Sequence, residues 1–292
     1  MLVIIKICVV NAMNPSAKAF KLWNMGCAVL LILVAGFFLI KENSYEVTNM
    51  VSAAPDYSPS TEMLEWYFMP NEQGIQPEPT PESEIIKKYD GHYIGDSDEK
   101  IIYLTFDAGY ENGYTGQILD TLKKHRVPAA FFLVEYYFDS APEMVRRMMD
   151  DGHLVCNHTA NHKNLAHVTD FAEFQREVTR VEEKCLNVTG KELARYLRPP
   201  EGVYSERVLW YAQQMGYSTV FWSFAYFDWD NDNPPSRETA FAKIYPRTHN
   251  GEVALLHSTA KINADILDEL LTEWKRQGYA FGSLDHLTGS AE

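Results

Sequence analysis

From about residue 85 onward, short apolar runs alternate with amphipathic segments, and this alternation constrains the fold more than any other feature of the chain. Short apolar runs bounded by turn residues indicate buried strands, whereas apolar residues at steps of three and four indicate helices packed by one face. Strict alternation of the two predicts an α/β fold with a mostly parallel sheet covered by helices. Because about seven strands are expected, we predict a distorted, incomplete (β/α) barrel rather than an open sheet.

The predicted strands are Ile101–Phe106, Ala129–Val134, His153–Asn157, Tyr196–Arg198, Tyr217–Ser223, Glu252–His257 and Tyr279–Leu284. The predicted helices between them are Tyr114–His125, Pro142–Asp151, Asp170–Val188, a helix from Ser205 to Gly216, and Ala264–Gln277. The helix over residues 170–188 has the clearest pattern, and Gly190 follows it as a C-terminal stop.

The N-terminal third predicts a membrane-attached protein. Residues 1–21 precede the uncharged segment Leu22–Ile40, whose 19 residues are long enough as a helix to cross a bilayer core. Lys18 and Lys21 lie before this segment, so the positive-inside rule places the body outside the cytoplasm. We prefer an uncleaved anchor, with a cleaved signal peptide as the alternative. Residues 41–84 are rich in proline and are predicted as a tether to the folded domain, residues 85–292.

Composition excludes one class of partner and leaves the redox state of two cysteines open. The formal net charge of -14 argues against nucleic acid, whose binding requires Lys and Arg to neutralise phosphates. Hydrophobic residues make up 46% of the chain, which is enough for a core that needs no disulfides. Cys156 and Cys185 are therefore expected as small buried residues, and a bridge between them stays open.

Polar residues stand at or just after the ends of the predicted strands. In parallel β/α folds, side chains at the C-terminal strand ends meet on one face, so these residues are expected to share a site. They are Asp107, His158, His162, Arg198, Asp228 and His257. The spacing of the two histidines, i and i+4, would place both on one side of a helical turn, where they could bind a metal. The alternative is a pair of surface or capping histidines.

Each of the other residues has a chemical and a structural interpretation. Asp107 fits a general base that Arg198 holds ionised, or a turn-forming residue before Gly109. His257 fits a general acid whose tautomer Asp228 fixes, or a core histidine with satisfied hydrogen bonds. Such a set of groups would hydrolyse an amide or ester.

In this order, the residues resemble a known family. The motifs are Thr105–Tyr110 (TFDAGY), His158–His162 (HTANH), Arg198–Gly202 (RPPEG), Asp228–Trp229 and Leu255–His257. The chain resembles the polysaccharide deacetylases with a NodB-type domain, carbohydrate esterase family 4. The resemblance implies that Asp107 is the base, His257 the acid, and His158 and His162 are metal ligands. It also implies that Arg198 orients Asp107 and Asp228 pairs with His257. The substrate contacts that it implies are Tyr110, the backbone N–H of Glu201 at the oxyanion, Tyr204, Trp229 and Leu255.

One departure from the family pattern affects the metal. Most members have a second Asp, a third metal ligand, where this chain has Ala108. A divalent metal such as zinc is therefore expected to bind weakly, and a non-catalytic wall-binding protein is the alternative that this change raises.

The same change, followed by Glu111–Tyr114 (ENGY), resembles the branch of muramic-δ-lactam-forming de-N-acetylases of spore-forming bacteria. The resemblance implies hydrolytic removal of the acetyl group from N-acetylmuramic acid in a peptidoglycan glycan strand. We expect a monomer anchored at the outer face of the membrane, in the cell envelope or the space between the forespore membranes. Other N- or O-acetylated polysaccharides, namely chitin oligomers, poly-N-acetylglucosamine and xylan, remain as alternative substrates.

Overall fold

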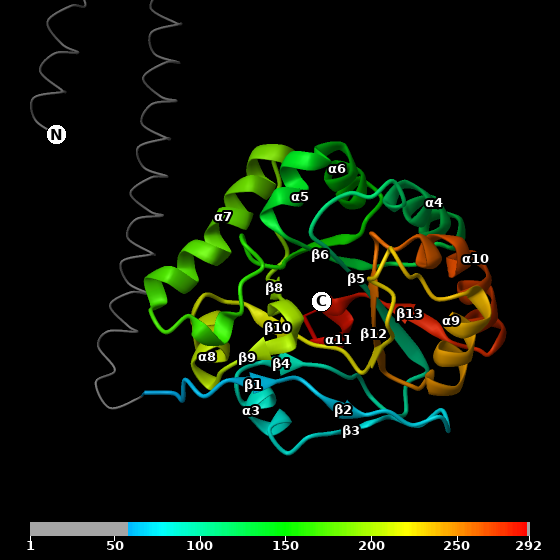
Figure 1. Ribbon diagram of the computed structural model, residues 1–292, viewed down its shortest axis with the longest axis horizontal. Coiled ribbons are helices and arrows are strands. Elements are labelled where there is room, and N and C mark those ends of the chain that lie inside the picture. The colour runs from blue at the N-terminus through cyan, green and yellow to red at the C-terminus, as the bar shows by residue number, and fades with distance from the viewer. Residues whose placement is uncertain (1–57, 291–292) are drawn as a thin grey trace, which may run out of the picture. The chain divides into compact units, whose positions relative to one another are not determined.

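A curled sheet of parallel strands forms the centre of the protein (Figure 1). The structure, a computed structural model, describes residues 58–290. The main run of the sheet has the order β11-β12-β5-β6-β7-β8-β10-β4, and β13 pairs with the first half of β5. Every pairing within this sheet is parallel, as the alternating pattern predicts.

The longest strand, β5 (Ile101–Ala108), lies between β12 (Glu252–His257) and β6 (Ala130–Leu133). The other strands of the sheet are β4 (Gly91–His92), β7 (Leu154–Asn157), β8 (Tyr196–Leu197), β10 (Ser218–Val220), β11 (Phe224–Ala225) and β13 (Ala280–Gly282). All seven predicted strands are present, with ends shifted by a few residues. The strands β4 and β11 were missed because two residues carry no periodic pattern.

The two ends of this sheet approach each other. Strands β10 and β11 stand at or next to opposite ends of the strand order, yet only Phe221–Ser223 separate them in the chain. Since an extended chain covers at most about 3.6 Å per residue, Val220 and Phe224 lie within roughly 14 Å of each other. The sheet is therefore an incomplete barrel. Of the predicted strand Tyr217–Ser223, only Ser218–Val220 (β10) is a strand, and Phe221–Ser223 connect it to β11 at the other end of the strand order.

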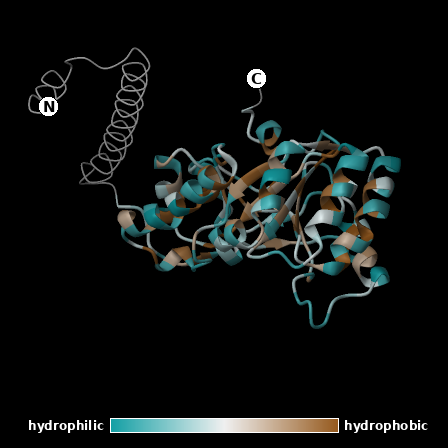
Figure 2. Ribbon diagram, turned by 90° about the horizontal axis from the view of Figure 1, so that it is seen from above, coloured by the Kyte–Doolittle hydropathy of each residue, from teal (hydrophilic) through white to brown (hydrophobic). Residues whose placement is uncertain are grey.

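Helices surround the outside of the curled sheet (Figure 1). They are α4 (Thr115–His125), α5 (Glu135–Ser140), α6 (Pro142–Asp150), α7 (Phe171–Thr189), α8 (Glu206–Gln214), α9 (Arg237–Ile244) and α10 (Lys261–Arg276). Helix α7 begins where the Asp170 side chain accepts a hydrogen bond from the N–H of Ala172, and ends at Gly190 with φ 70°. Hydrophobic segments lie mainly in the strands and hydrophilic ones on the outer helices (Figure 2).

Side chains from the strands fill the barrel interior, and a short helix covers its N-terminal end. The cluster includes Tyr103, Phe132, Cys156, Tyr196, Val220 and Val253. Helix α11 (Leu284–Leu287) lies against this end, where the hydroxyl of Tyr103 is 2.9 Å from Nδ1 of His286. The opposite end, where the strands finish, is left to polar residues. Cys156 and Cys185 are both buried and free, so the bridge that the sequence left open is not formed.

The part of the predicted tether that the structure describes is packed against the domain. Strand β1 (Leu64–Glu65) pairs with β9 (Val203–Tyr204), and β2 (Phe68–Met69) pairs with β3 (Glu78–Pro79). Helix α3 (Ser83–Lys88) and three 3-10 turns, η1 (Leu165–His167), η2 (Pro200–Gly202) and η3 (Tyr245–Arg247), complete the elements. The folded domain therefore begins before residue 85, because Trp66 and Phe68 contribute apolar surface to a core cluster.

None of the helices in residues 58–290 is long and apolar enough to span a membrane. The predicted anchor, Leu22–Ile40, lies outside the described residues.

Candidate active site

A buried ion pair joins two strands that are not neighbours in the sheet. Nη1 of Arg198, which follows β8, donates to Oδ1 of Asp107 in β5 over 2.7 Å. The guanidinium also donates to the carbonyl oxygens of Val220 and Phe221. Burial alone would raise the pKa of Asp107, but the charge of Arg198 and the nearby His158 and His257 lower it below its usual range. Asp107 is thus held as a carboxylate, the form that a general base requires.

The strand register places His257 next to Asp107. The two residues are direct partners across the parallel pair β12 and β5, so both side chains leave the sheet on the same face. Asp228, which follows β11, accepts hydrogen bonds from Nδ1 of His257 at 2.7 Å and from its backbone N–H at 2.8 Å. Burial would lower the pKa of His257, but the charge and hydrogen bond of Asp228 outweigh it and raise the pKa. His257 is thereby favoured as an imidazolium, the form that donates a proton.

Asn263 and Tyr226 support Asp228, and the sequence analysis missed both. The Nδ2 amide group of Asn263 donates to Oδ2 of Asp228 at 2.5 Å and to the carbonyl oxygen of His257 at 3.0 Å. Both of these partners can only accept, so the amide must point its NH₂ group at them. Its oxygen then faces the hydroxyl of Tyr226, at 2.5 Å. No spacing rule reveals this series of hydrogen bonds, because in the sequence Asn263 looks like an ordinary polar position of helix α10.

The two predicted metal ligands lie together, in a loop rather than on a helical turn. His158 and His162 lie in a loop after β7, and their ring centroids are 5.0 Å apart. Positive φ angles at Thr159 (68°) and His162 (51°) fold the loop back on itself, which brings the rings together without a helix. Glu177 in α7 holds this loop, since its carboxylate accepts bonds from both the backbone and the side chain of Asn161.

The donor atoms of His158 fit a cation. Its Nδ1 donates to the carbonyl oxygen of Arg198 over 2.8 Å, so the lone pair of a neutral ring lies on Nε2. Burial lowers the pKa of His158 to about 4, and the ring is therefore neutral near pH 7. Its Nε2 is 3.6 Å from Oδ2 of Asp107. These two electron-rich atoms lie close together in a buried site, and a bound metal cation would satisfy both.

The site offers few protein ligands for a metal ion. Among residues 58–290, no group of three or more His, Cys, Asp or Glu side chains is arranged to hold a metal. Ala108, at the position of the family's second Asp, is buried at the end of β5 and supplies no donor. His158 and His162 would therefore be the protein's imidazole donors to a weakly held ion.

The predicted substrate contacts are distributed unevenly. Trp229 is 52% exposed, and its ring centroid is 5.8 Å from that of His257. Leu255 lies two residues before His257 in β12, on the same face of the strand. Tyr110 is exposed just after β5, and Glu201 is exposed with φ 60° in the turn after Arg198. Tyr204, in contrast, is 1% exposed and packs inside an aromatic cluster, so the structure does not bring its ring to the site.

Comparison with known proteins gives the family. The profile of the family described as "Polysaccharide deacetylase" matches residues 94–220. Peptidoglycan-N-acetylmuramic acid deacetylase PdaA of Bacillus subtilis is 44% identical over 203 residues, which cover 70% of this chain and 77% of that protein. The chain belongs to the polysaccharide deacetylase family. As a polysaccharide deacetylase it is also similar to a peptidoglycan-N-acetylglucosamine deacetylase of Bacillus cereus, with 32% identity over 68% of this chain and 72% of that protein.

Similarity to a solved structure also supports membership of the polysaccharide deacetylase family. The structure of Bacillus subtilis PdaA, described as a family 4 carbohydrate esterase, superposes with a TM-score of 0.77 and 40% identity. The match covers 80% of this chain and 100% of that one. The profile match includes Asp107, His158, His162 and Arg198, whereas Asp228 and His257 follow it in the chain. The family assignment that the five motifs predicted is confirmed.

Proposed function

We propose that this protein hydrolyses the N-acetyl group of N-acetylmuramic acid residues in peptidoglycan. One observation carries the proposal: Asp107 and His257 are register partners on β5 and β12, and a separate buried partner holds each in the charge state its role needs. The similarity to PdaA, which has 44% identity, supports muramic acid as the sugar.

The residues perform the reaction in two proton transfers. Asp107 accepts a proton from a water molecule as that water attacks the acetamide carbonyl carbon. The backbone N–H of Glu201 faces the oxyanion that forms, and the imidazolium of His257 protonates the sugar nitrogen as the C–N bond breaks. Acetate and a free amine are the products. A divalent metal bound by His158 and His162 would supply polarisation of the carbonyl oxygen.

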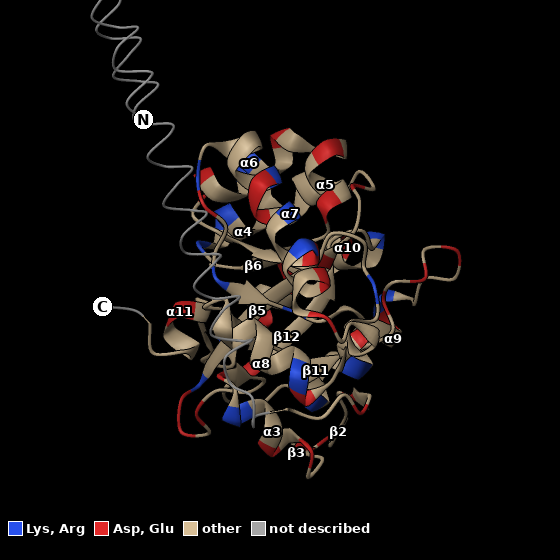
Figure 3. Cartoon of the chain, turned by 90° about the vertical axis from the view of Figure 1, so that its left-hand side faces the viewer, with Lys and Arg blue, Asp and Glu red and all other residues tan. Residues whose placement is uncertain are grey.

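The proposal extends to the fate of the product and the place of the reaction. The free amine of muramic acid can attack the lactyl carboxyl of the same residue, which closes a δ-lactam with loss of water. Such lactams belong to spore cortex peptidoglycan, as the branch resemblance implies. The proposal also places the protein at the outer face of the membrane, attached through Leu22–Ile40. The intermixed Lys, Arg, Asp and Glu segments of the face drawn in Figure 3 suit a substrate other than nucleic acid.

Mass spectrometry of digested glycan tests the substrate. Purified protein is incubated with peptidoglycan and with peptide-free glycan strands, each with and without added divalent metal. Muropeptides should lose one acetyl unit, C₂H₂O, from muramic acid, and lactam closure should remove a further H₂O. Loss of acetyl from glucosamine alone would transfer the assignment to the activity named for the Bacillus cereus relative.

A further inference from the structure

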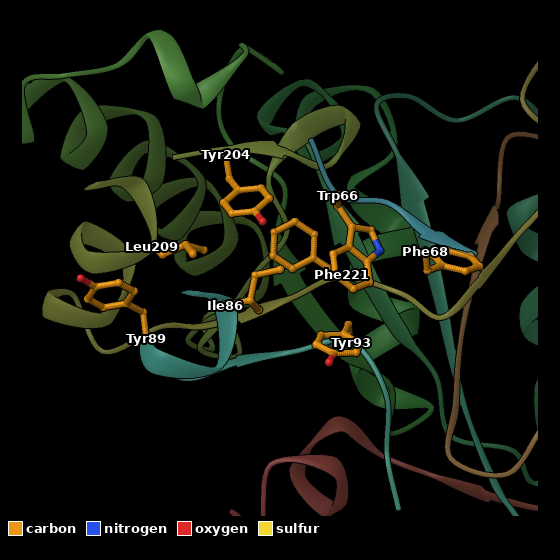
Figure 4. Packing of buried hydrophobic residues seen from close by; sticks show 8 residues of the cluster. All are labelled: Trp66, Phe68, Ile86, Tyr89, Tyr93, Tyr204, Leu209 and Phe221. Carbon is orange, nitrogen blue, oxygen red and sulfur yellow. The ribbon is translucent and has the colours of Figure 1, made fainter. Parts of the chain in front are cut away.

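An aromatic residue outside the family profile match contacts two segments of the active site. Trp66 lies between β1 and β2, before the first residue of the family profile match at 94. Its indole is buried among Tyr93, Phe221 and Phe68, with ring centroids 4.6, 5.4 and 6.3 Å away. Figure 4 shows the Phe221 ring between those of Trp66 and Tyr204. Packing alone would account for a buried tryptophan, but its polar contacts indicate a more specific role.

The first polar contact is to the turn that carries Glu201. The backbone N–H of Trp66 donates to the carbonyl oxygen of Gly202 over 2.8 Å. The neighbouring β1 residues pair with Val203 and Tyr204, so this turn is fastened to the N-terminal segment by main-chain hydrogen bonds. A Cβ on Gly202 would lie 3.2 Å from Cβ of Trp66, which shows how closely the two chains approach. The turn includes a non-glycine residue at positive φ, a conformation that surrounding contacts must maintain.

The second polar contact is to the segment that holds Arg198. The indole Nε1–H of Trp66 donates to the carbonyl oxygen of Trp222 over 2.8 Å. The two preceding carbonyls, of Val220 and Phe221, accept the hydrogen bonds of the Arg198 guanidinium. That guanidinium lies 5.7 Å from the Trp222 ring and donates to Asp107. One residue therefore contacts both segments: its backbone N–H binds the turn that carries Glu201, and its indole binds the segment whose carbonyl oxygens accept the hydrogen bonds of Arg198.

We propose that Trp66 is a positioning residue for deacetylation, holding the Pro199–Gly202 turn and the Val220–Trp222 segment in register with each other. The proposal rests on the function proposed above. It makes Trp66 part of the working enzyme rather than of a tether, because the geometry of both segments depends on contacts that this residue supplies.

The test uses two variants of the full-length protein in the same cluster. Trp66→Phe keeps an aromatic ring in the core but removes the Nε1–H donor, whereas Phe68→Leu reduces packing in the same core cluster and removes no hydrogen bond to either segment. We expect kcat to fall about 5- to 10-fold in Trp66→Phe with KM little changed, the size expected for one buried hydrogen bond. Phe68→Leu should lower the melting temperature but leave kcat unchanged below the transition.

A second readout does not depend on activity. Backbone hydrogen exchange, followed by mass spectrometry, should accelerate in peptides that contain residues 199–204 and 220–223 in Trp66→Phe, and not in Phe68→Leu. Equal kcat values and equal exchange in the two variants would overturn the positioning role. An inactive wild-type protein would refute the proposed function, and the exchange measurement would still decide whether Trp66 holds the two segments.

Discussion

Asp107 and His257 are register partners on two adjacent parallel strands, one on β5 and the other on β12. The base and the acid therefore stand side by side on adjacent strands, about 5 Å apart at the backbone, rather than facing each other across a wide cleft. Each has its own buried counter-ion, Arg198 for Asp107 and Asp228 for His257. These two partners favour a base that is ionised and an acid that is protonated in the same pH range.

Removal of the base should abolish useful turnover and leave the fold intact. Asp107→Asn has nearly the same volume but cannot accept the proton from water, and loss of a general base costs about 10²- to 10⁴-fold in rate. We expect a fall in kcat of that size, measured as acetate release. Asp120→Asn, a change at an exposed carboxylate, is the control. Wild-type turnover in Asp107→Asn would remove this residue from the mechanism.

The pH dependence should reveal the partner of the acid. The pKa of His257 is raised by Asp228, and activity should fall as pH rises through that pKa because the imidazolium loses its proton. Asp228→Asn removes the charge that raises the pKa, so the alkaline limb of the kcat profile should move to lower pH. Asp230→Asn, a change at a nearby partly exposed carboxylate, should leave the limb in place. An unmoved limb in Asp228→Asn would contradict the pairing.

The hydrogen-bond chain behind Asp228 predicts a graded series of variants. Asn263→Ala removes one donor to the Asp228 carboxylate, and hydrogen bonds to charged groups contribute about 1.5–3 kcal/mol, so kcat should fall about tenfold or more. Asn263→Asp should be worse, because a like charge would face Asp228. Tyr226→Phe frees the amide to rotate and should have a smaller effect. Thr272→Ala, a change at an exposed position of the same helix, should leave activity unchanged. If Asn263→Ala were as active as this control, the hydrogen bonds behind Asp228 would have no role in catalysis.

Metal affinity should depend on the two histidines and on residue 108. Titration calorimetry with Zn²⁺ should show weaker binding in His162→Ala than in wild type, and no change in His167→Ala, an exposed histidine in η1. Ala108→Asp restores the carboxylate that most of the family has, and we expect it to tighten binding about tenfold or more, since metal affinity rises with the number of donors. Equal affinity in wild type and His162→Ala would exclude the histidine pair as ligands.

The folded protein should become less stable as the pH rises, because the pKa of one buried carboxyl group is raised. Burial raises the pKa of Glu252, at the start of β12, to about 8 from its ordinary value of 4.5. Between these two values the folded protein holds a proton that the unfolded chain has released, so stability decreases as pH rises through that window. The melting temperature of Glu252→Gln should therefore decline less between pH 5 and 8 than that of wild type. The exposed control Glu192→Gln should follow the wild-type curve; an identical slope in Glu252→Gln would show that Glu252 is ionised in the fold.

Local sequence pattern was sufficient for seven strands of the central sheet, the long helices and the order of polar residues along the chain. Buried parallel strands must be apolar over their length and packed helices must repeat at three and four, so both leave a periodic record. The polar residues that break these patterns at strand ends, such as Asp107 and His257, stand out for the same reason. The five motifs in their order were then enough to predict the family.

Contacts between distant segments were decided only by the tertiary structure. The register of β5 with β12, the meeting of Arg198 and Asp107 from non-adjacent strands, and the loop that brings His158 to His162 depend on barrel curvature and on two residues with positive φ. Trp66 and Asn263 reach the site from a presumed tether and an ordinary helix. A side chain's neighbours in sequence carry no information about a partner tens of residues away or more, which is why packing rather than pattern determined these roles.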